Sequence, residues 1–293
     1  MPTTRPAAVA GLFYPGDPAQ LASTVSALLQ RAAATAVSVQ PADGIDPFPK
    51  ALIVPHAGYV YSGQTAASAY ALLARQPERV RRVVLLGPVH RVPVRGLALP
   101  QADAFETPLG RVPIAAEAVA ALRGLPQVVS SSAAHAHEHS LEVQLPLLQS
   151  LLADFELLPL AVGEASTAEV AEVIEALWGG PETLIVVSSD LSHFLDYRCA
   201  QQTDDATVRR MLALEGGISH QQACGAIPVN GLLLAARRRG LSARLIAQCN
   251  SGDRAGDRER VVGYASISFH QPLPAASTTT TPANGTKETA HVH

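Results

Sequence analysis

Four short apolar segments of this 293-residue chain are each followed by a residue that can bind a metal ion or carry a proton. Short aliphatic segments bounded by Gly, Pro or polar residues are typical of buried strands in an α/β sheet. Ligands of such sheets bind in the crevice beyond the carboxyl ends of the strands. The segments and the residues after them are Ala51–Val54 with His56, Val83–Leu86 with His90, Leu184–Val187 with Asp190 and His193, and Leu245–Ala247 with Cys249. We therefore expect these five side chains to meet at one edge of a sheet.

Predicted helices and strands alternate along the chain. Helices are expected at 18–31, 63–75, 115–123, 167–177, 199–214 and 229–239, with a further helix capped by Ser140, and additional strands at 157–162 and 261–269. This alternation predicts α/β architecture: a single domain over residues 1–270, with a central, mostly parallel or mixed sheet and helices on both faces. Residues 271–293 contain few large apolar side chains and are expected to form a disordered tail.

The composition argues against several classes of partner. No apolar stretch approaches the roughly 18–20 residues that a membrane helix needs, so we expect no membrane association. The start of the chain lacks the apolar segment of a signal peptide, which favours a cytoplasmic location. The formal net charge is −3, and the one dense basic run, Arg237–Arg239, lies at a predicted helix end. We therefore expect no nucleic-acid partner.

Two histidines and a cysteine are the candidate metal ligands. Alone, His56 or His90 could equally be a turn residue, but two histidines placed in the same way after successive strands favour a metal site. Cys249 could be a small buried apolar residue, whereas a thiolate beside two imidazoles suits Cu(I), Zn(II) or Fe(II). Three cysteines do not make a disulfide framework, and Cys199 and Cys224 are expected to be structural because they lie in or near predicted helices.

Asp190 and His193 follow the third apolar segment directly. A carboxylate that orients an imidazole is a common way to make a general base or a partner of a metal ligand. The pair is therefore our candidate for catalytic proton transfer. The alternative is that Asp190 caps a helix whose first turn contains His193, and the two readings are compatible.

The segment from 135 to 142 is rich in histidine and glutamate. We expect His139 and Glu142 to line a substrate pocket, with Tyr59 on its wall. The alternatives are a helix-dipole role for Glu142 and core packing for Tyr59. His135 and His137 are expected to be surface residues.

Taken together, the motifs of this chain resemble those of the Memo family, known in bacteria and archaea as the AmmeMemoRadiSam system protein B. They span nearly everything from about residue 5 to residue 269. The matching stretches are Ala10-Gly-Leu-Phe-Tyr-Pro15, Pro55-His-Ala-Gly-Tyr-Val-Tyr-Ser-Gly63, Leu86-Gly-Pro-Val-His90, Glu138-His-Ser-Leu-Glu142, Ser188-Ser-Asp-Leu-Ser-His-Phe194 and Gln248-Cys249.

The resemblance implies a fold similar to that of class III extradiol ring-cleaving dioxygenases, which use non-haem Fe(II) held by two His and one carboxylate. It implies that His56 and His90 are the metal-binding histidines and that Cys249 stands where the carboxylate would be. His193 then resembles the acid/base histidine of the dioxygenases, with Asp190 beside it. A thiolate in the ligand set favours copper or redox chemistry over ring cleavage.

The leading functional hypothesis is therefore a metal-dependent redox protein that binds Fe(II) or Cu. Zinc is the third possibility, because a His/His/Cys site can also activate water for hydrolysis. The alternative hypothesis is a non-enzymatic module that binds a peptide or a small molecule in the same pocket. The family's system name also implies a pathway link to a radical-SAM enzyme and an Ammecr-type protein.

Overall fold

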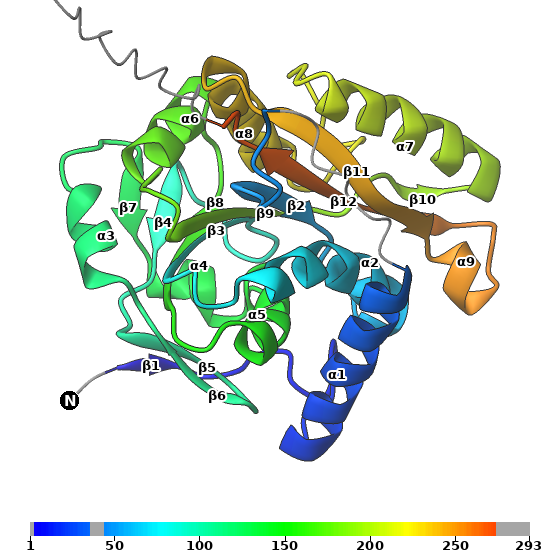
Figure 1. Cartoon of the computed structure of the whole chain (residues 1–293), viewed down its shortest axis with the longest axis horizontal. Coiled ribbons are helices and arrows are strands. Elements are labelled where there is room, and N and C mark those ends of the chain that lie inside the picture. The colour runs from blue at the N-terminus through cyan, green and yellow to red at the C-terminus, as the bar shows by residue number, and fades with distance from the viewer. Residues whose placement is uncertain (1–2, 36–43, 274–293) are drawn as a thin grey trace, which may run out of the picture.

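Parallel strands form the centre of the protein and determine where its loops meet. The computed structural model describes residues 3–35 and 44–273 (Figure 1). The large sheet has the strand order β10-β12-β2-β9-β3-β8-β4-β7. A further strand, β11, pairs with the edge of β12 that faces away from β2. Its strands are β2 (Ala51–Val54), β3 (Arg82–Pro88), β4 (Leu97–Leu99), β7 (Val128–Ser130), β8 (Glu156–Val162), β9 (Thr183–Ser188), β10 (His193–Leu195), β11 (Ser242–Asn250) and β12 (Val261–His270). Because β2, β9, β3 and β8 are parallel neighbours, their carboxyl ends lie at the same edge.

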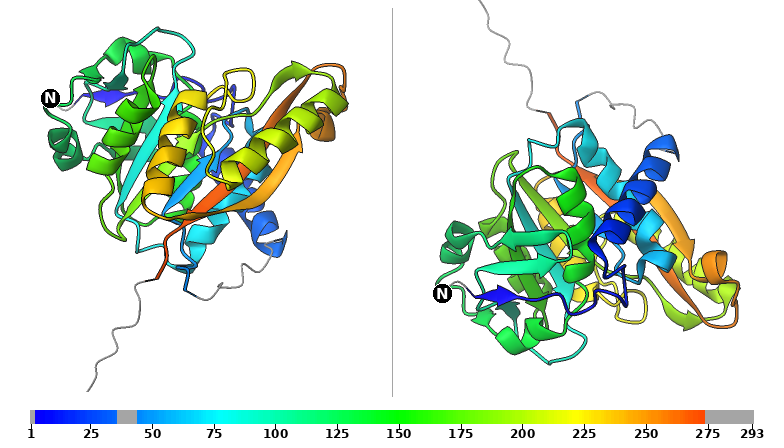
Figure 2. Two further views of the ribbon diagram at one scale, coloured as in Figure 1. Left: turned by 90° about the horizontal axis from the view of Figure 1, so that it is seen from above. Right: turned by 90° about the horizontal axis from the view of Figure 1, so that it is seen from below.

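Each central strand is buried on both faces, and its side chains alternate between two apolar cores. Along β2, Ala51 and Ile53 belong to one core, while Leu52 and Val54 belong to the other. This alternation follows from the two-residue period of a strand and explains why these segments are continuously apolar. The first core includes residues of α6 (Thr167–Ala176), α7 (Tyr197–Leu212) and α8 (Ala226–Arg238). The second includes residues of α1 (Pro18–Thr35), α2 (Tyr59–Tyr70) and α5 (Leu145–Leu151), so helices cover both faces of the sheet (Figure 2).

Smaller elements complete the structure. A second sheet of order β1-β5-β6 lies beside the main one (Figure 2). The remaining elements are β1 (Thr4–Arg5), β5 (Ala104–Thr107), β6 (Gly110–Pro113), α3 (Ala116–Ala121), α4 (Ser132–Ala136), α9 (Gly252–Ala255) and the short 3-10 helices η1 (Ala71–Arg75) and η2 (Glu142–Gln144).

The predicted α/β architecture, with a mixed sheet between helices, is confirmed. The short strands β1, β4, β5, β6, β7 and β10 were not predicted, because segments of two to four residues show little periodicity. The helix expected from Ser140 was placed wrongly: the Ser140 hydroxyl donates to Pro88, and α5 begins only at Leu145. None of the helices in the described ranges is both long and apolar enough to cross a membrane.

The predicted tail is ordered over its first three residues. Gln271 accepts a hydrogen bond from the backbone of Asp46, and the Leu273 N–H donates to Gly44. These contacts lie at the expected start of the tail, at about residue 271, and its disorder stays a prediction. The remainder of the predicted tail, 274–293, lies outside the described residues.

A buried carboxylate joins the N-terminal segment to the main body of the protein. Glu142 is fully buried and forms an ion pair with Arg5. It also accepts hydrogen bonds from the backbone N–H groups of Ala8 (2.8 Å) and Val9 (3.0 Å) and from the Tyr14 hydroxyl. Each carboxylate oxygen therefore accepts two hydrogen bonds from within the protein. The predicted substrate-binding role of Glu142 is replaced by a structural one.

His135 is a core residue, contrary to the prediction that it lies on the surface. It is 1 % exposed, and its Nε2 donates to the carbonyl of Ala98 in β4 at 2.8 Å. Burial lowers the pKa of His135 to about 4, so the imidazole is neutral in the folded protein at neutral pH. Its neighbour His137 is exposed, as predicted.

Replacing Glu142 by Gln should destabilise the fold strongly. The substitution keeps the shape but leaves the Arg5 guanidinium buried without a counter-charge, which costs about 3–5 kcal/mol in comparable sites. Urea denaturation measures the difference. Glu117→Gln is the matched control, because Glu117 is 93 % exposed and lies 3.7 Å from Arg82. Equal stability of the two variants would contradict the structural role of Glu142.

His135 should make the protein sensitive to acid. The unfolded imidazole takes up a proton near its ordinary pKa of 6.5, but the folded one does so only near 4. Stability is therefore fully present above pH 6.5 and falls as the pH drops toward 4. Between these two pH values the free energy of unfolding of the wild type should fall by about 2–3 kcal/mol more than that of His135→Gln.

Denaturation curves at several pH values test this difference, and His137→Gln serves as the control because its side chain is exposed. An identical acid response in His135→Gln and the wild type would exclude the buried imidazole as its source.

Candidate metal centre

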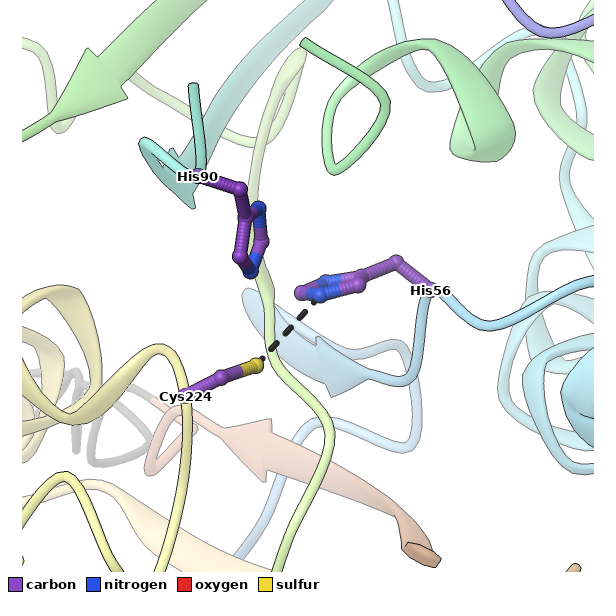
Figure 3. A group of neighbouring side chains, drawn as sticks. All are labelled: His56, His90 and Cys224. Carbon is purple, nitrogen blue, oxygen red and sulfur yellow. Dashed lines mark hydrogen bonds between the residues drawn. The ribbon is translucent and has the colours of Figure 1, made fainter. Parts of the chain in front are cut away.

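His56 and His90 meet at the carboxyl edge of the parallel strands, as predicted. His56 follows β2 after one proline, and His90 lies two residues beyond β3. The third member of the group is Cys224, from the turn that leads into α8 (Figure 3). One ligand atom from each of the three residues lies within 4.8 Å of the others, and Cys224 Sγ is 3.3 Å from His56 Nε2.

A buried hydrogen-bond network determines the tautomer of His56. The hydroxyl of Ser188 donates its single hydrogen to the carbonyl of Ser140 at 2.6 Å. It must therefore accept from its two other partners, Gln144 Nε2 and His56 Nδ1, both at 2.9 Å. His56 consequently carries its hydrogen on Nδ1, and the lone pair of Nε2 faces Cys224.

His90 is oriented in the same way by a carboxylate. Its Nδ1 donates to Glu138 Oε1 at 2.9 Å, which leaves the Nε2 lone pair free to face His56 and Cys224 (Figure 3). Glu138 also accepts backbone N–H groups of His90, His139 and Ser140. Burial alone would raise its pKa, but the hydrogen bonds and charge of His90 and the backbone donors lower it to about 2. The carboxylate is thus ionised and holds the imidazole in place.

His139 joins His56 and His90 in a tight cluster of rings. Its ring centroid is 4.6 Å from that of His90 and 5.3 Å from that of His56. Burial lowers the pKa of His139 to about 4, so the ring is neutral at pH 7. Its Nδ1 is buried and lies 3.3 Å from Glu138 Oε1 without forming a hydrogen bond among the described residues. The predicted pocket position of His139 and the binding of a substrate there stay predictions.

Close packing of the backbone brings Cys224 to the histidines. A Cβ atom on Gly225 would lie 2.7 Å from Ser189 Cβ and 2.9 Å from the Ser188 carbonyl, so only glycine allows the turn to approach β9. The backbone N–H of Asp190 donates to Cys224 Sγ at 3.3 Å. Burial, with the nearby Asp190 carboxylate, raises the pKa of the thiol to about 12. Without a metal ion, therefore, this side chain is a neutral thiol.

Asp190 and His193 do not pair with each other. Asp190 Oδ1 accepts the backbone N–H of His56 at 2.7 Å, and burial raises the pKa of this carboxyl to about 7. His193 instead donates its Nδ1 hydrogen to the Leu191 carbonyl at 2.9 Å. The prediction that Asp190 orients the His193 ring is therefore wrong. The backbone carbonyl of Leu191 sets the His193 tautomer instead. The alternative of a helix cap is also wrong, because β10 follows Asp190 rather than a helix.

Cys249 lies away from the histidines, and Cys224 stands in the position predicted for it. The strand β12 lies between β11 and β2, which puts β11 two strand spacings, roughly 10 Å, from β2. Cys249 pairs in register with Tyr264, and its Sγ is 3.1 Å from the Thr65 hydroxyl. Cys224, which was expected to be structural, is thus the cysteine that this geometry places beside the two histidines. No spacing rule indicated it, since a lone Cys-Gly before an apolar helix is a weak signal.

Tyr59 is largely buried at this edge. Its side chain is 6 % exposed, and its hydroxyl donates to the carbonyl of Val143 at 2.8 Å. It also lines a cavity between α1 and α2 that does not include the two histidines or Cys224, and contact with a substrate there stays a prediction.

Comparison with known proteins identifies the family of this chain. Residues 5–268 match the family model for Memo-like proteins. The chain belongs to the Memo-like family. Among its Memo relatives, the MEMO1 family protein MK0963 of Methanopyrus kandleri is 34% identical over 284 residues, covering 91% of this chain and 99% of the relative. A MEMO1 family protein of Aquifex aeolicus is 34% identical over 278 residues, covering 90% and 98%. The resemblance to the Memo family is thereby confirmed.

One solved structure, an uncharacterized protein of Escherichia coli K12 named JW3007, aligns with a TM-score of 0.49 and 13% identity. The alignment covers 74% of this chain and 98% of that protein.

Nitrogen NMR of the imidazole rings should find the hydrogen on Nδ1 in both His56 and His90 of the metal-free protein. Ser188→Ala should produce a mixture of tautomers at His56, because the obligatory acceptor is gone. His90 serves as the internal control, since Glu138 still binds it in the variant. A His56 ring that keeps its Nδ1 hydrogen in Ser188→Ala would contradict the network.

Proposed function

We propose that His56, His90 and Cys224 bind one redox-active transition-metal ion, copper or iron, and that the protein is a metal-dependent redox protein. The observation that supports this most directly is the convergence of two imidazole lone pairs and one thiol within 4.8 Å. The Nδ1 hydrogens of both rings are bonded away from this space, so both Nε2 lone pairs face it. The lone pair of His56 lies 3.3 Å from Cys224 Sγ, whose proton would be released when the sulfur binds an ion as a thiolate.

The donor set fits such an ion. Imidazole nitrogen suits copper, iron and zinc, and a thiolate sulfur favours the softer ions among them. Glu138 and Ser188 hold the outer nitrogens of the two rings, the arrangement that raises the basicity of metal-binding histidines. A bound copper or iron ion would supply one-electron chemistry, while zinc would supply a Lewis acid only.

His193 is the residue that we assign to proton transfer. Its Nδ1 hydrogen is committed to the Leu191 carbonyl, so Nε2 carries the lone pair that can accept a proton. The ring is partly exposed, and burial together with the nearby His90 lowers its pKa. Asp190 acts at a distance from the chemistry: by holding the backbone N–H of His56, it fixes the loop that presents this ligand.

Protein purified anaerobically from medium with iron, copper and zinc should contain about one metal ion per chain, as measured by plasma mass spectrometry. Cys224→Ser should weaken metal binding by more than about tenfold, because it removes one of three ligands. Cys249→Ser is the matched control and should keep the wild-type metal content, since its sulfur bonds to Thr65 instead.

Absence of iron and copper from the wild type would overturn the redox proposal, and the alternative of a non-enzymatic binding module would replace it. Retention of zinc alone would favour hydrolytic chemistry. Loss of metal in Cys249→Ser, with retention in Cys224→Ser, would show that Cys249 is the ligand implied by the family resemblance.

A further inference from the structure

A cleft opens directly onto the candidate metal centre. It has a volume of about 570 Å³, within the range that small-molecule sites occupy. Both His90 and Cys224 line it, and it lies between the loop after β3, the end of β8 and the start of α8. It therefore occupies the crevice beyond the carboxyl ends of two neighbouring parallel strands, where α/β sheets bind their ligands.

The interior of the cleft is apolar. Its lining includes Val89, Val94, Val162, Ile227 and Pro228, which come from three separate segments of the chain. Val162 and Pro228 are buried, and Val89, Val94 and Ile227 are partly buried, so these side chains form a continuous apolar wall. A ligand that fills this space must have a compact apolar body, because a fully polar one would lose its hydration without compensation.

The charges around the cleft favour an anionic group on that body. Arg91 lies in its wall, is exposed, and forms no ion pair among the described residues. The first turn of α8, with no acidic residue, also faces the cleft and adds partial positive charge. His220 adds a second basic side chain, and Glu164 is the one carboxylate in the lining. Guanidinium binds carboxylate in a fork geometry, which makes Arg91 the anchor.

We propose that this cleft binds the substrate of the metal centre and that the substrate is a small organic carboxylate with a compact apolar body. The apolar part packs between the β3 loop and α8, the carboxylate meets Arg91, and the opposite end of the molecule lies against His90 and Cys224. This inference rests on the proposed function, because it treats the cluster as the reactive end of the cleft.

Calorimetric titration with benzoate, benzamide and benzylammonium tests the charge of the ligand on one apolar body. Benzoate should bind the full-length, metal-loaded protein about tenfold tighter than benzamide, and benzylammonium should bind most weakly. Arg91→Gln should weaken benzoate binding about tenfold and leave benzamide binding unchanged, which also shows that the variant is folded. Ile227→Glu should weaken both benzoate and benzamide, because it places a charge in the apolar wall.

Arg123→Gln is the matched control, since this exposed arginine lies outside the cleft lining, and it should bind all three probes as the wild type does. Equal affinity for benzoate and benzamide, preference for benzylammonium, or unchanged benzoate binding in Arg91→Gln would each overturn the inference. Metal content is measured on every sample. A wild type that holds its metal but shows no charge preference contradicts only this inference, whereas a wild type without metal contradicts the proposed function.

Discussion

The short segment from Glu138 to Gln144 holds the ends of three strands together, and the candidate centre depends on it. Four of its polar side chains are buried and hydrogen-bonded, those of Glu138, Ser140, Glu142 and Gln144. Glu138 binds the loop after β3, Ser140 binds β3 through its hydroxyl and β9 through its carbonyl, and Gln144 binds the backbone after β2. Glu142 in the same segment anchors the N-terminal residues through Arg5. In a low-dielectric interior such a network is stable only when every member finds its partner, so the strand ends are fixed in one arrangement.

The same network prepares the chemistry of the site. The hydrogen bonds that stabilise the fold are also those that set the ring tautomers of His56 and His90, so the two lone pairs converge in the folded protein before any ion binds. The rings of His56, His90 and His139 lie with their centroids 4.6–5.3 Å apart, and the Cys224 thiol lies beside them. The cleft next to these rings has a mostly apolar lining. This arrangement suits a ligand with an apolar body and one reactive end.

Much of this could be predicted from the pattern of residues along the chain. Continuous aliphatic segments predicted the central strands correctly, and the rule that parallel strands end at one edge correctly brought His56 and His90 together. The choice between Cys224 and Cys249 could not be made in this way. Cys224 precedes a helix and Cys249 lies in a strand, and neither position by itself indicates a site. The deciding facts are that β12 lies between β11 and β2 and that Gly225 lets a remote turn approach β9.

The amino-acid pattern therefore determined the architecture, the family and the meeting of His56 with His90, because these depend on local periodicity and on motifs that are contiguous in the chain. Only the tertiary structure decided which cysteine lies beside the two histidines, the buried state of His135 and the structural role of Glu142. These depend on which partners reach a side chain across more than a hundred residues of sequence, and hydrogen bonds and burial of that kind leave no local signal.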